Sequence, residues 1–181
     1  MIDTADTLPA IAPMPRALLR DPLEFFAADH MRQRAAFSLI EYLATAETLD
    51  RTIAAQLLKF LQDDMAVHVL DEEDDLFPLL RRRCEPEDDI ALVLADLSAE
   101  HTAEERIAAD VRVGLAQALE TDCPVGEIED LGKRMLAFAH AESRHLALEN
   151  SILLPLARAR LTREDIHDLS RRMTYRRAAG S

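Results

Sequence analysis

The chain has 181 residues, of which 49% are hydrophobic and 30% charged, and 21 basic against 34 acidic residues give it a net charge of −13. This length suits one domain, and the negative charge disfavours nucleic acid and anionic membrane surfaces as partners. Two cysteines are too few for a disulfide framework, so we expect a soluble protein in a reducing, cytoplasmic setting.

Residues 1–20 are expected to form a flexible N-terminal arm. They contain three prolines and two aspartates, and they lack the basic start and apolar core of a secretory signal. No run of eighteen apolar residues occurs in the chain, so we expect no membrane-spanning helix.

The rest of the chain is predicted to be all-α, because stretches rich in alanine and leucine, with few glycines and no tryptophan, favour helices over strands. Asp21, followed by Pro22 and Glu24, is typical of a helix start, and Asp50 is a suitable cap for the next helix. The expected helices cover residues 21–48, 50–83, 86–119 and 127–160. Short loops between long helices favour an up-down antiparallel four-helix bundle. We place this bundle at residues 21–161, and a short extra C-terminal helix, capped by Thr162, with its tail at residues 162–181.

An internal repeat pairs residues 68–83 with residues 145–160 without gaps. In both copies His, Glu, Leu, Pro, Leu and two Arg recur at the same offsets, beginning with a His-x-x-x-Glu motif. A weaker match pairs Asp29-His30 with Glu100-His101, each on the preceding helix. The chain therefore consists of two similar helical hairpins, each of which supplies one lone histidine and one His-x-x-x-Glu motif.

The spacing of four places His68 above Glu72, and His145 above Glu149, on one face of each helix. Apolar residues recur on the same faces, so these polar groups should point into the bundle. A buried carboxylate without compensation costs several kcal/mol, and a pair of metal ions bridged by carboxylates supplies that compensation. Imidazole suits iron, zinc and copper. Four histidines and two glutamates would leave positions for a bridging oxygen and an external ligand.

A single inward histidine in a helical bundle is more often a hydrogen-bonded core group than a ligand, and a structural bundle with an empty site remains an alternative. The repetition of the whole pattern favours metal binding, because chance would not repeat the motif together with its downstream leucine and proline. Ferritin-like bundles use Glu-x-x-His at a spacing of three, which this sequence does not match.

With these motifs, residues 22–160 resemble the hemerythrin HHE cation-binding domain family. The resemblance implies two iron ions per chain, oxo- or hydroxo-bridged, with zinc or manganese as possible substitutes. It also implies a set of terminal histidine ligands and two bridging carboxylates. These are His30, His68, His101 and His145 as terminal ligands, and Glu72 and Glu149 as bridges.

The sequence departs from oxygen-carrying hemerythrins at Glu105, where those proteins have a second histidine four residues after the ligand on the third helix. We therefore include Glu105 as a candidate metal ligand, with an exposed or pocket-lining glutamate as the alternative. An anionic ligand would favour ferric iron over reversible oxygen release. His140, His167, Cys84 and Cys123 are not expected to bind metal, since His140 lies about 140° around the helix from His145.

The leading hypothesis is a di-iron protein that binds or senses oxygen, nitric oxide or peroxide, the small molecules we expect as its partners. An alternative is a di-iron redox enzyme or an iron donor in iron–sulfur centre repair. Nothing in the sequence separates binding from catalysis.

Overall fold

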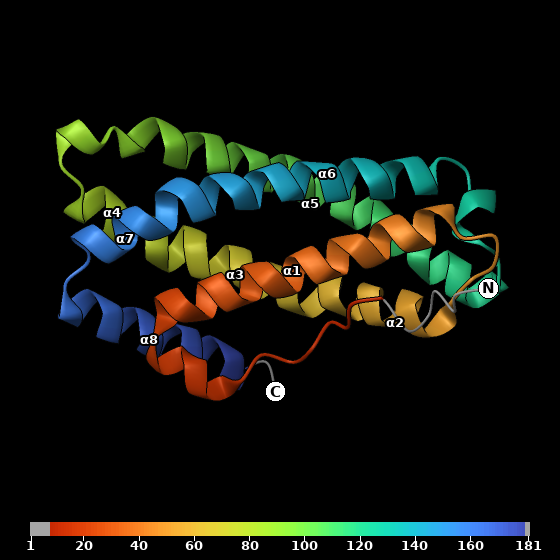
Figure 1. Cartoon of the computed structure of the whole chain (residues 1–181), viewed down its shortest axis with the longest axis horizontal. Coiled ribbons are helices and arrows are strands. Elements are labelled where there is room, and N and C mark those ends of the chain that lie inside the picture. The colour runs from red at the N-terminus through yellow and green to blue at the C-terminus, as the bar shows by residue number, and fades with distance from the viewer. Residues whose placement is uncertain (1–7, 180–181) are drawn as a thin grey trace.

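The computed structural model describes residues 8–179 and shows an all-α bundle of four long antiparallel rods with one additional helix (Figure 1). Two rods are built from several helical segments in direct succession. In chain order the α-helices are α1 (Pro22–Thr45), α2 (Arg51–Lys59), α3 (Met65–Asp71), α4 (Phe77–Arg83), α5 (Ile90–Thr121), α6 (Leu131–Leu148), α7 (Leu154–Arg160) and α8 (Arg163–Ala179). The four rods are α1, the run from α2 to α4, α5, and the run of α6 and α7. The second and the fourth rod both pack against the first and the third. The predicted fold class is confirmed.

Side-chain caps fix the predicted helix starts. Asp21 accepts a hydrogen bond from the Glu24 amide at 3.3 Å, and Asp50 accepts one from the Ile53 amide at 3.1 Å. At the start of α8, the Thr162 hydroxyl accepts a hydrogen bond from the Asp165 amide at 3.2 Å. Each bond satisfies an amide that has no partner within its own helix.

Three helix boundaries differ by a few residues from the predicted ones. The first rod ends at Thr45 rather than at residue 48. The third and fourth begin at Ile90 and Leu131, about four residues later than expected. In both cases the preceding aspartate has a left-handed backbone, with φ of 47° at Asp89 and 56° at Asp130, so the α-helix cannot extend further back.

The two metal-motif rods widen into π-helical turns at equivalent places. These turns are η4 (Glu72–Leu76) and η7 (Glu149–Leu153), and a third, η3 (Phe60–Asp64), lies earlier in the second rod. Pro78 and Pro155 follow η4 and η7 by two residues. A proline inside a helix has no N–H and clashes with the carbonyl four residues before it, and a local π turn relieves that clash. The repeated proline thus accounts for the repeated π turn, which begins at the motif glutamate.

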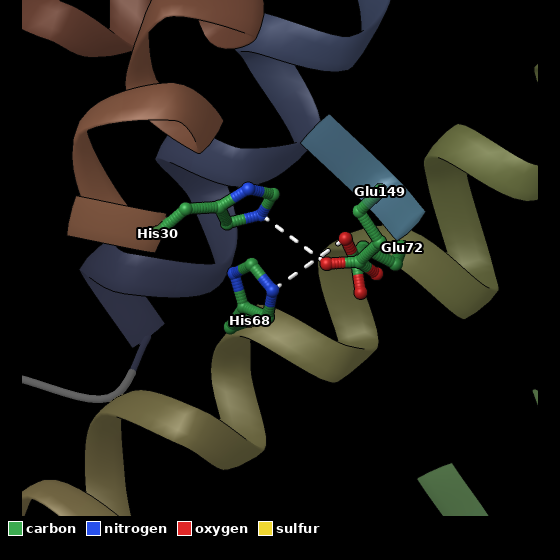
Figure 2. Close-up of side chains that lie close together, drawn as sticks. All are labelled: His30, His68, Glu72 and Glu149. Atoms are coloured by element: carbon green, nitrogen blue, oxygen red, sulfur yellow. Dashed lines mark ion pairs between the residues drawn. The ribbon is translucent and has the colours of Figure 1, made fainter. Parts of the chain in front are cut away.

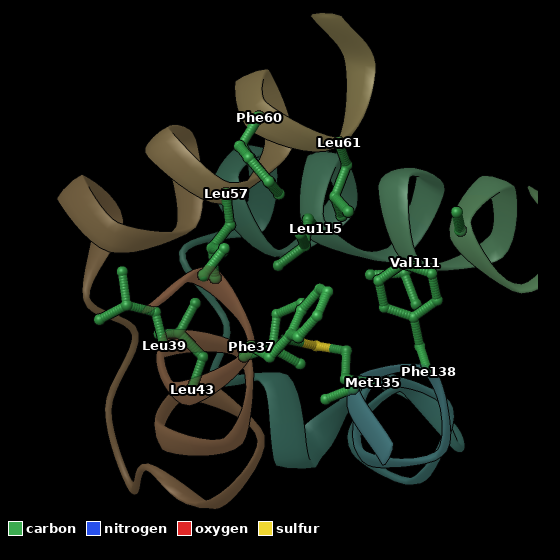
Figure 3. Packing of buried hydrophobic residues seen from close by; sticks show 14 of the residues in the cluster. Phe37, Leu39, Leu43, Leu57, Phe60, Leu61, Val111, Leu115, Met135 and Phe138 are labelled. Atoms are coloured by element: carbon green, nitrogen blue, oxygen red, sulfur yellow. The ribbon is translucent and has the colours of Figure 1, made fainter. Parts of the chain in front are cut away.

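Two hydrophobic clusters fill the bundle, one on either side of a polar layer. The first includes Phe37, Phe60, Leu115 and Phe138, whose rings and methyl groups interdigitate (Figure 3). The second lies towards the opposite end of the rods and includes the following buried residues: Phe26, Leu76, Phe77, Leu94 and Leu153. In each rod, the histidines and glutamates of the motifs fall between the segments that contribute to the two clusters.

The C-terminal helix α8 is 17 residues long and packs against α3, the turn η4 and α1. Its Leu169 and Met173 are fully buried in the second hydrophobic cluster. Arg176 forms ion pairs with Asp71 and Asp75, two carboxylates whose side chains are at most 1% exposed. These contacts attach α8 to the segment that carries the first His-x-x-x-Glu motif.

Residues 1–7 of the expected N-terminal arm, and the last two residues of the expected tail, lie outside the described residues. Of the rest of the arm, Ile11 is buried in the first hydrophobic cluster and Leu19 in the second. The predicted mobility of the arm stays a prediction. Among the described residues, no helix has the length and apolar character needed to cross a membrane.

We expect the Arg176→Met substitution to lower the free energy of unfolding by about 1–3 kcal/mol, because it leaves two buried carboxylates with fewer charged donors. Arg171→Met is the matched control, since Arg171 is 69% exposed and its one ion pair within residues 8–179 is with Asp168 on its own helix. That control should change stability by less than about 0.5 kcal/mol. Urea denaturation of both variants measures the difference. Equal stabilities would show that α8 is not held by these ion pairs.

Candidate metal centre

The structure brings six of the seven candidate ligands together in the polar layer of the bundle. His30 comes from α1, His68 from α3, His101 from α5 and His145 from α6, while Glu72 and Glu149 are the first residues of η4 and η7. All six residues are at most 9% exposed. They form two groups of four that share both glutamates: His30 and His68 with Glu72 and Glu149, and His101 and His145 with the same two.

Each glutamate directs one of its two oxygens towards each histidine pair. Glu72 Oε1 lies 3.5 Å from His68 Nε2, and Glu72 Oε2 lies 3.3 Å from His101 Nε2. Glu149 Oε2 lies 3.4 Å from His30 Nε2, and Glu149 Oε1 lies 2.9 Å from His145 Nε2. Figure 2 shows the first histidine pair directed towards the two carboxylates. This is the arrangement that a carboxylate bridge between two cations requires.

Several of these buried atoms have no hydrogen-bond partner in the described chain. They include both oxygens of Glu72, both ring nitrogens of His30 and Oε2 of Glu149. Buried polar atoms are almost always satisfied in folded proteins, and an exception calls for an unseen partner such as an ion. Apart from Nδ1 of His30, these atoms lie where the two groups meet, and imidazole and carboxylate are suitable ligands for iron. The residues therefore fit a pair of metal ions.

Carboxylates hold the outer nitrogens of three of the histidines. Nδ1 of His68 lies 3.0 Å from Asp29, and Nδ1 of His101 lies 2.7 Å from Glu73. Nδ1 of His145 lies 2.9 Å from Glu100 and 3.6 Å from Glu104. Such partners orient the ring, leave Nε2 free to bind a metal and make the imidazole a stronger base. Sequence reasoning missed these carboxylates, although the repeated acidic residue before each lone histidine was a signal for two of them.

The surroundings shift the pKa values of the clustered residues in different directions. Burial raises the pKa of Glu72 well above its usual range, and the nearby Glu149 carboxylate raises it further. Burial, together with the neighbouring His68, lowers the pKa of His30 to about 4. For His145, burial acts in the opposite direction, but the hydrogen bond to Glu149 raises the pKa to about 9. At neutral pH His145 therefore carries a proton, whereas His30 is ready to bind a metal.

The structure does not bring Glu105 to this cluster. Its side chain is 63% exposed and accepts hydrogen bonds from the Arg112 guanidinium at 2.6 and 3.2 Å. The preceding residue, Glu104, turns inward instead and is 6% exposed. Glu104 and Glu105 follow His101 by three and four residues, and both positions lie near its face of the helix. Spacing alone therefore could not show which of the two points inward. The arrangement does not support Glu105 as a ligand.

The other two histidines and both cysteines lie outside the cluster. The His140 side chain is 70% exposed and lies 3.8 Å from Glu41. His167 is exposed on α8, and Cys84 and Cys123 are partly buried free thiols at the ends of helices.

The bundle and its paired histidine and glutamate groups define a helical protein built to bind cations. The family model of the hemerythrin HHE cation-binding domain matches residues 21–157, and the chain belongs to this family. The match includes all six clustered residues and ends before α8. No curated protein matches the chain.

We expect His68→Ala and Glu149→Ala to lower metal affinity by at least about 10–100-fold, the effect that loss of an outer-shell partner alone has at metal sites. Metal binds only the folded chain, so these variants should also lose the rise in melting temperature that metal gives the unmodified protein. His140→Ala and His167→Ala are the matched controls and should keep their metal. Elemental analysis measures the metal content, and thermal denaturation with and without metal measures the change in melting temperature. Full metal content in His68→Ala would refute its role as a ligand.

We expect metal affinity to rise between pH 7 and pH 9 by up to about tenfold per pH unit, because the incoming ion must displace the proton of His145, whose pKa is about 9. This pKa exceeds the unfolded value of 6.5, so the bound proton stabilises the metal-free fold below pH 6.5, and that stability is lost as the pH rises towards 9. Calorimetric titration with Zn²⁺ at pH 7 and pH 9, in buffers of different ionisation enthalpy, measures both affinity and proton release. A pH-independent affinity with no proton release would contradict the assignment.

Proposed function

We propose that this protein holds two iron ions and binds or senses oxygen, nitric oxide or peroxide at them. The observation that carries the proposal is the pair of two-histidine groups that share Glu72 and Glu149. Three of the four carboxylate oxygens of these glutamates have no hydrogen-bond partner among the described residues. Family membership supports cation binding. The choice of iron rests on the mixed imidazole and carboxylate ligand set.

The proposed mechanism assigns different tasks to the residues of the chain. His30 and His68 would hold one ion, His101 and His145 the other, and the two glutamates would join them. Each ion would receive four protein donors, which leaves coordination positions for a small molecule. Bound iron supplies the one-electron chemistry that oxygen, nitric oxide and peroxide require. The two hydrophobic clusters on either side of the polar layer exclude bulk water, which strengthens the attraction between ligands and ions.

A second candidate is a redox enzyme that reduces a small oxidant. Two further buried carboxyl groups, Glu104 and Glu142, lie beside the cluster, and burial raises the pKa of both. Carboxyl groups that hold protons near the ions would supply the protons that such a reduction consumes. An iron donor is less consistent with the structure, because iron would have to leave a site whose six ligands are all buried.

Metal analysis and optical spectra of protein purified without chelator test the proposal. We expect about two iron ions per chain and a spectrum that changes when reduced protein meets oxygen, nitric oxide or peroxide. The double variant His68→Ala/Glu149→Ala is the control and should show neither. Stoichiometric consumption of peroxide supports binding or sensing, whereas continued turnover with an electron donor supports the enzyme. A chain without iron, or with iron that is indifferent to all three molecules, would refute the proposal.

A further inference from the structure

A cavity of about 200 Å³ lies between α3 and α5, beside the metal cluster. His68, His101 and His145 contribute to its floor, and residues of α1 and α6 complete it. An engineered protein cavity of about 150 Å³ is large enough to bind benzene, and one water molecule occupies about 30 Å³. This cavity is therefore larger than a diatomic gas or peroxide needs, and its size suits a small organic molecule.

The cavity has an apolar wall and an acidic inner region. The wall is formed by Leu61, Met65, Val69, Ala108 and Leu146. The acidic region is formed by Glu104 and Glu142, which are 6% and 5% exposed. Apolar lining with a few convergent polar groups is the usual composition of a small-molecule site.

These two glutamates are not needed by the metal cluster. The outer nitrogens of His68, His101 and His145 are already held by the carboxylates of Asp29, Glu73 and Glu100, respectively. Glu104 is 3.6 Å from His145, further than Glu100 is, and no hydrogen bond or ion pair joins Glu142 to another described residue. A buried carboxyl group requires a donor or a cation, and the cavity is the space from which one can come.

The internal repeat shows that the acidity of the cavity is specific to the second hairpin. Aligning His30 with His101 pairs Gln33 with Glu104, and aligning His68 with His145 pairs Met65 with Glu142. All four residues line this one cavity. The metal ligands are the same in both halves, yet the cavity has an amide and a thioether on one side and two carboxyl groups on the other. Symmetry of the metal centre therefore does not explain the acidic pair.

The outer part of the cavity does not favour anions. Arg112 is the one arginine among the lining residues, and both its terminal nitrogens donate to Glu105. Its charge is thereby compensated within the chain, so no lining arginine is left to attract an anion towards the two carboxyl groups. A ligand that donates N–H bonds would satisfy those groups and place its apolar part against the wall.

We propose that this cavity binds a small organic cation, a primary ammonium group on an apolar body of about the size of a benzene ring, with the ammonium at Glu104 and Glu142. The proposal goes beyond the reaction of the metal pair with small oxidants. It depends on the cavity and its acidic pair, and a failure of the proposed oxidant chemistry leaves it standing.

Calorimetric titration of the metal-containing protein with benzylammonium, benzyl alcohol and phenylacetate tests the proposal. These probes share a ring and differ in the charge of the head group. We expect benzylammonium to bind at least about tenfold more tightly than benzyl alcohol, since charge-assisted hydrogen bonds exceed neutral ones by that margin, and phenylacetate to bind most weakly. Equal binding of the three probes, or no binding of benzylammonium, would overturn the proposal.

Variants locate the binding. Glu142→Gln keeps the shape of the side chain and should abolish the preference for benzylammonium over benzyl alcohol. Ala108→Leu should fill the cavity and block both probes, with Val69→Phe as a second filling variant should the first fail to fold. Ala103→Leu is the matched control, because Ala103 is exposed on the same helix. Metal content is measured for every variant, so that loss of the metal pair is separated from loss of the cavity. Unchanged benzylammonium binding in the folded filling variants would place the ligand elsewhere and overturn the proposal.

Discussion

The constraint on which this structure depends is the burial of two carboxylates, Glu72 and Glu149, in the middle of a helical bundle. Neither is exposed, and the cost of burying such charges without compensation is several kcal/mol each. Four histidines on four separate elements surround them, and the polar layer divides the apolar interior into two clusters. Bound metal ions would supply the remaining positive charge, so metal binding would also stabilise the folded bundle.

Charge compensation extends outward from this centre in layers. Carboxylates of Asp29, Glu73 and Glu100 hold the outer nitrogens of three of the four clustered histidines. In the rod that carries Glu72, the preceding residue Asp71 points to the other side and is paired with Arg176 of α8. The carboxylate of Glu72 thus faces the clustered histidines, whereas that of Asp71 pairs with arginines of α8. The helix α8 lies beyond the family match, so this chain supplies the second layer from outside its HHE domain.

Most of the fold and the six clustered residues could be predicted from the sequence because they follow from local spacing and repetition. Two copies of His-x-x-x-Glu on apolar faces define where the helices must meet, and Asp21 and Asp50 mark where helices begin. The π turn at Glu72 depends on how the rod accommodates Pro78, and the left-handed residues Asp89 and Asp130 carry no clear local signal. The choice of Glu104 over Glu105 as the inward side chain required the rotation of α5 against its neighbours, which only the packed structure determines.

The repeat that supplies the six clustered residues also shows where the two hairpins differ. Asp29, before the lone histidine of the first hairpin, supports His68 of that hairpin, and Glu100 supports His145 in the same way in the second. This shared role explains the acidic residue that precedes each lone histidine.

The support that crosses between the hairpins is unequal. Glu73 of the first hairpin holds His101, whereas its counterpart in the second hairpin is the neutral Asn150. Both His101 and His145 therefore have a carboxylate at their outer nitrogen, whereas in the other pair His68 has one, from Asp29, and His30 has none among the described residues. The acidic cavity groups Glu104 and Glu142 also belong to the second hairpin. The histidine pair with two carboxylate partners and the acidic part of the cavity therefore belong to the same hairpin, and a bound organic cation would lie close to His101 and His145.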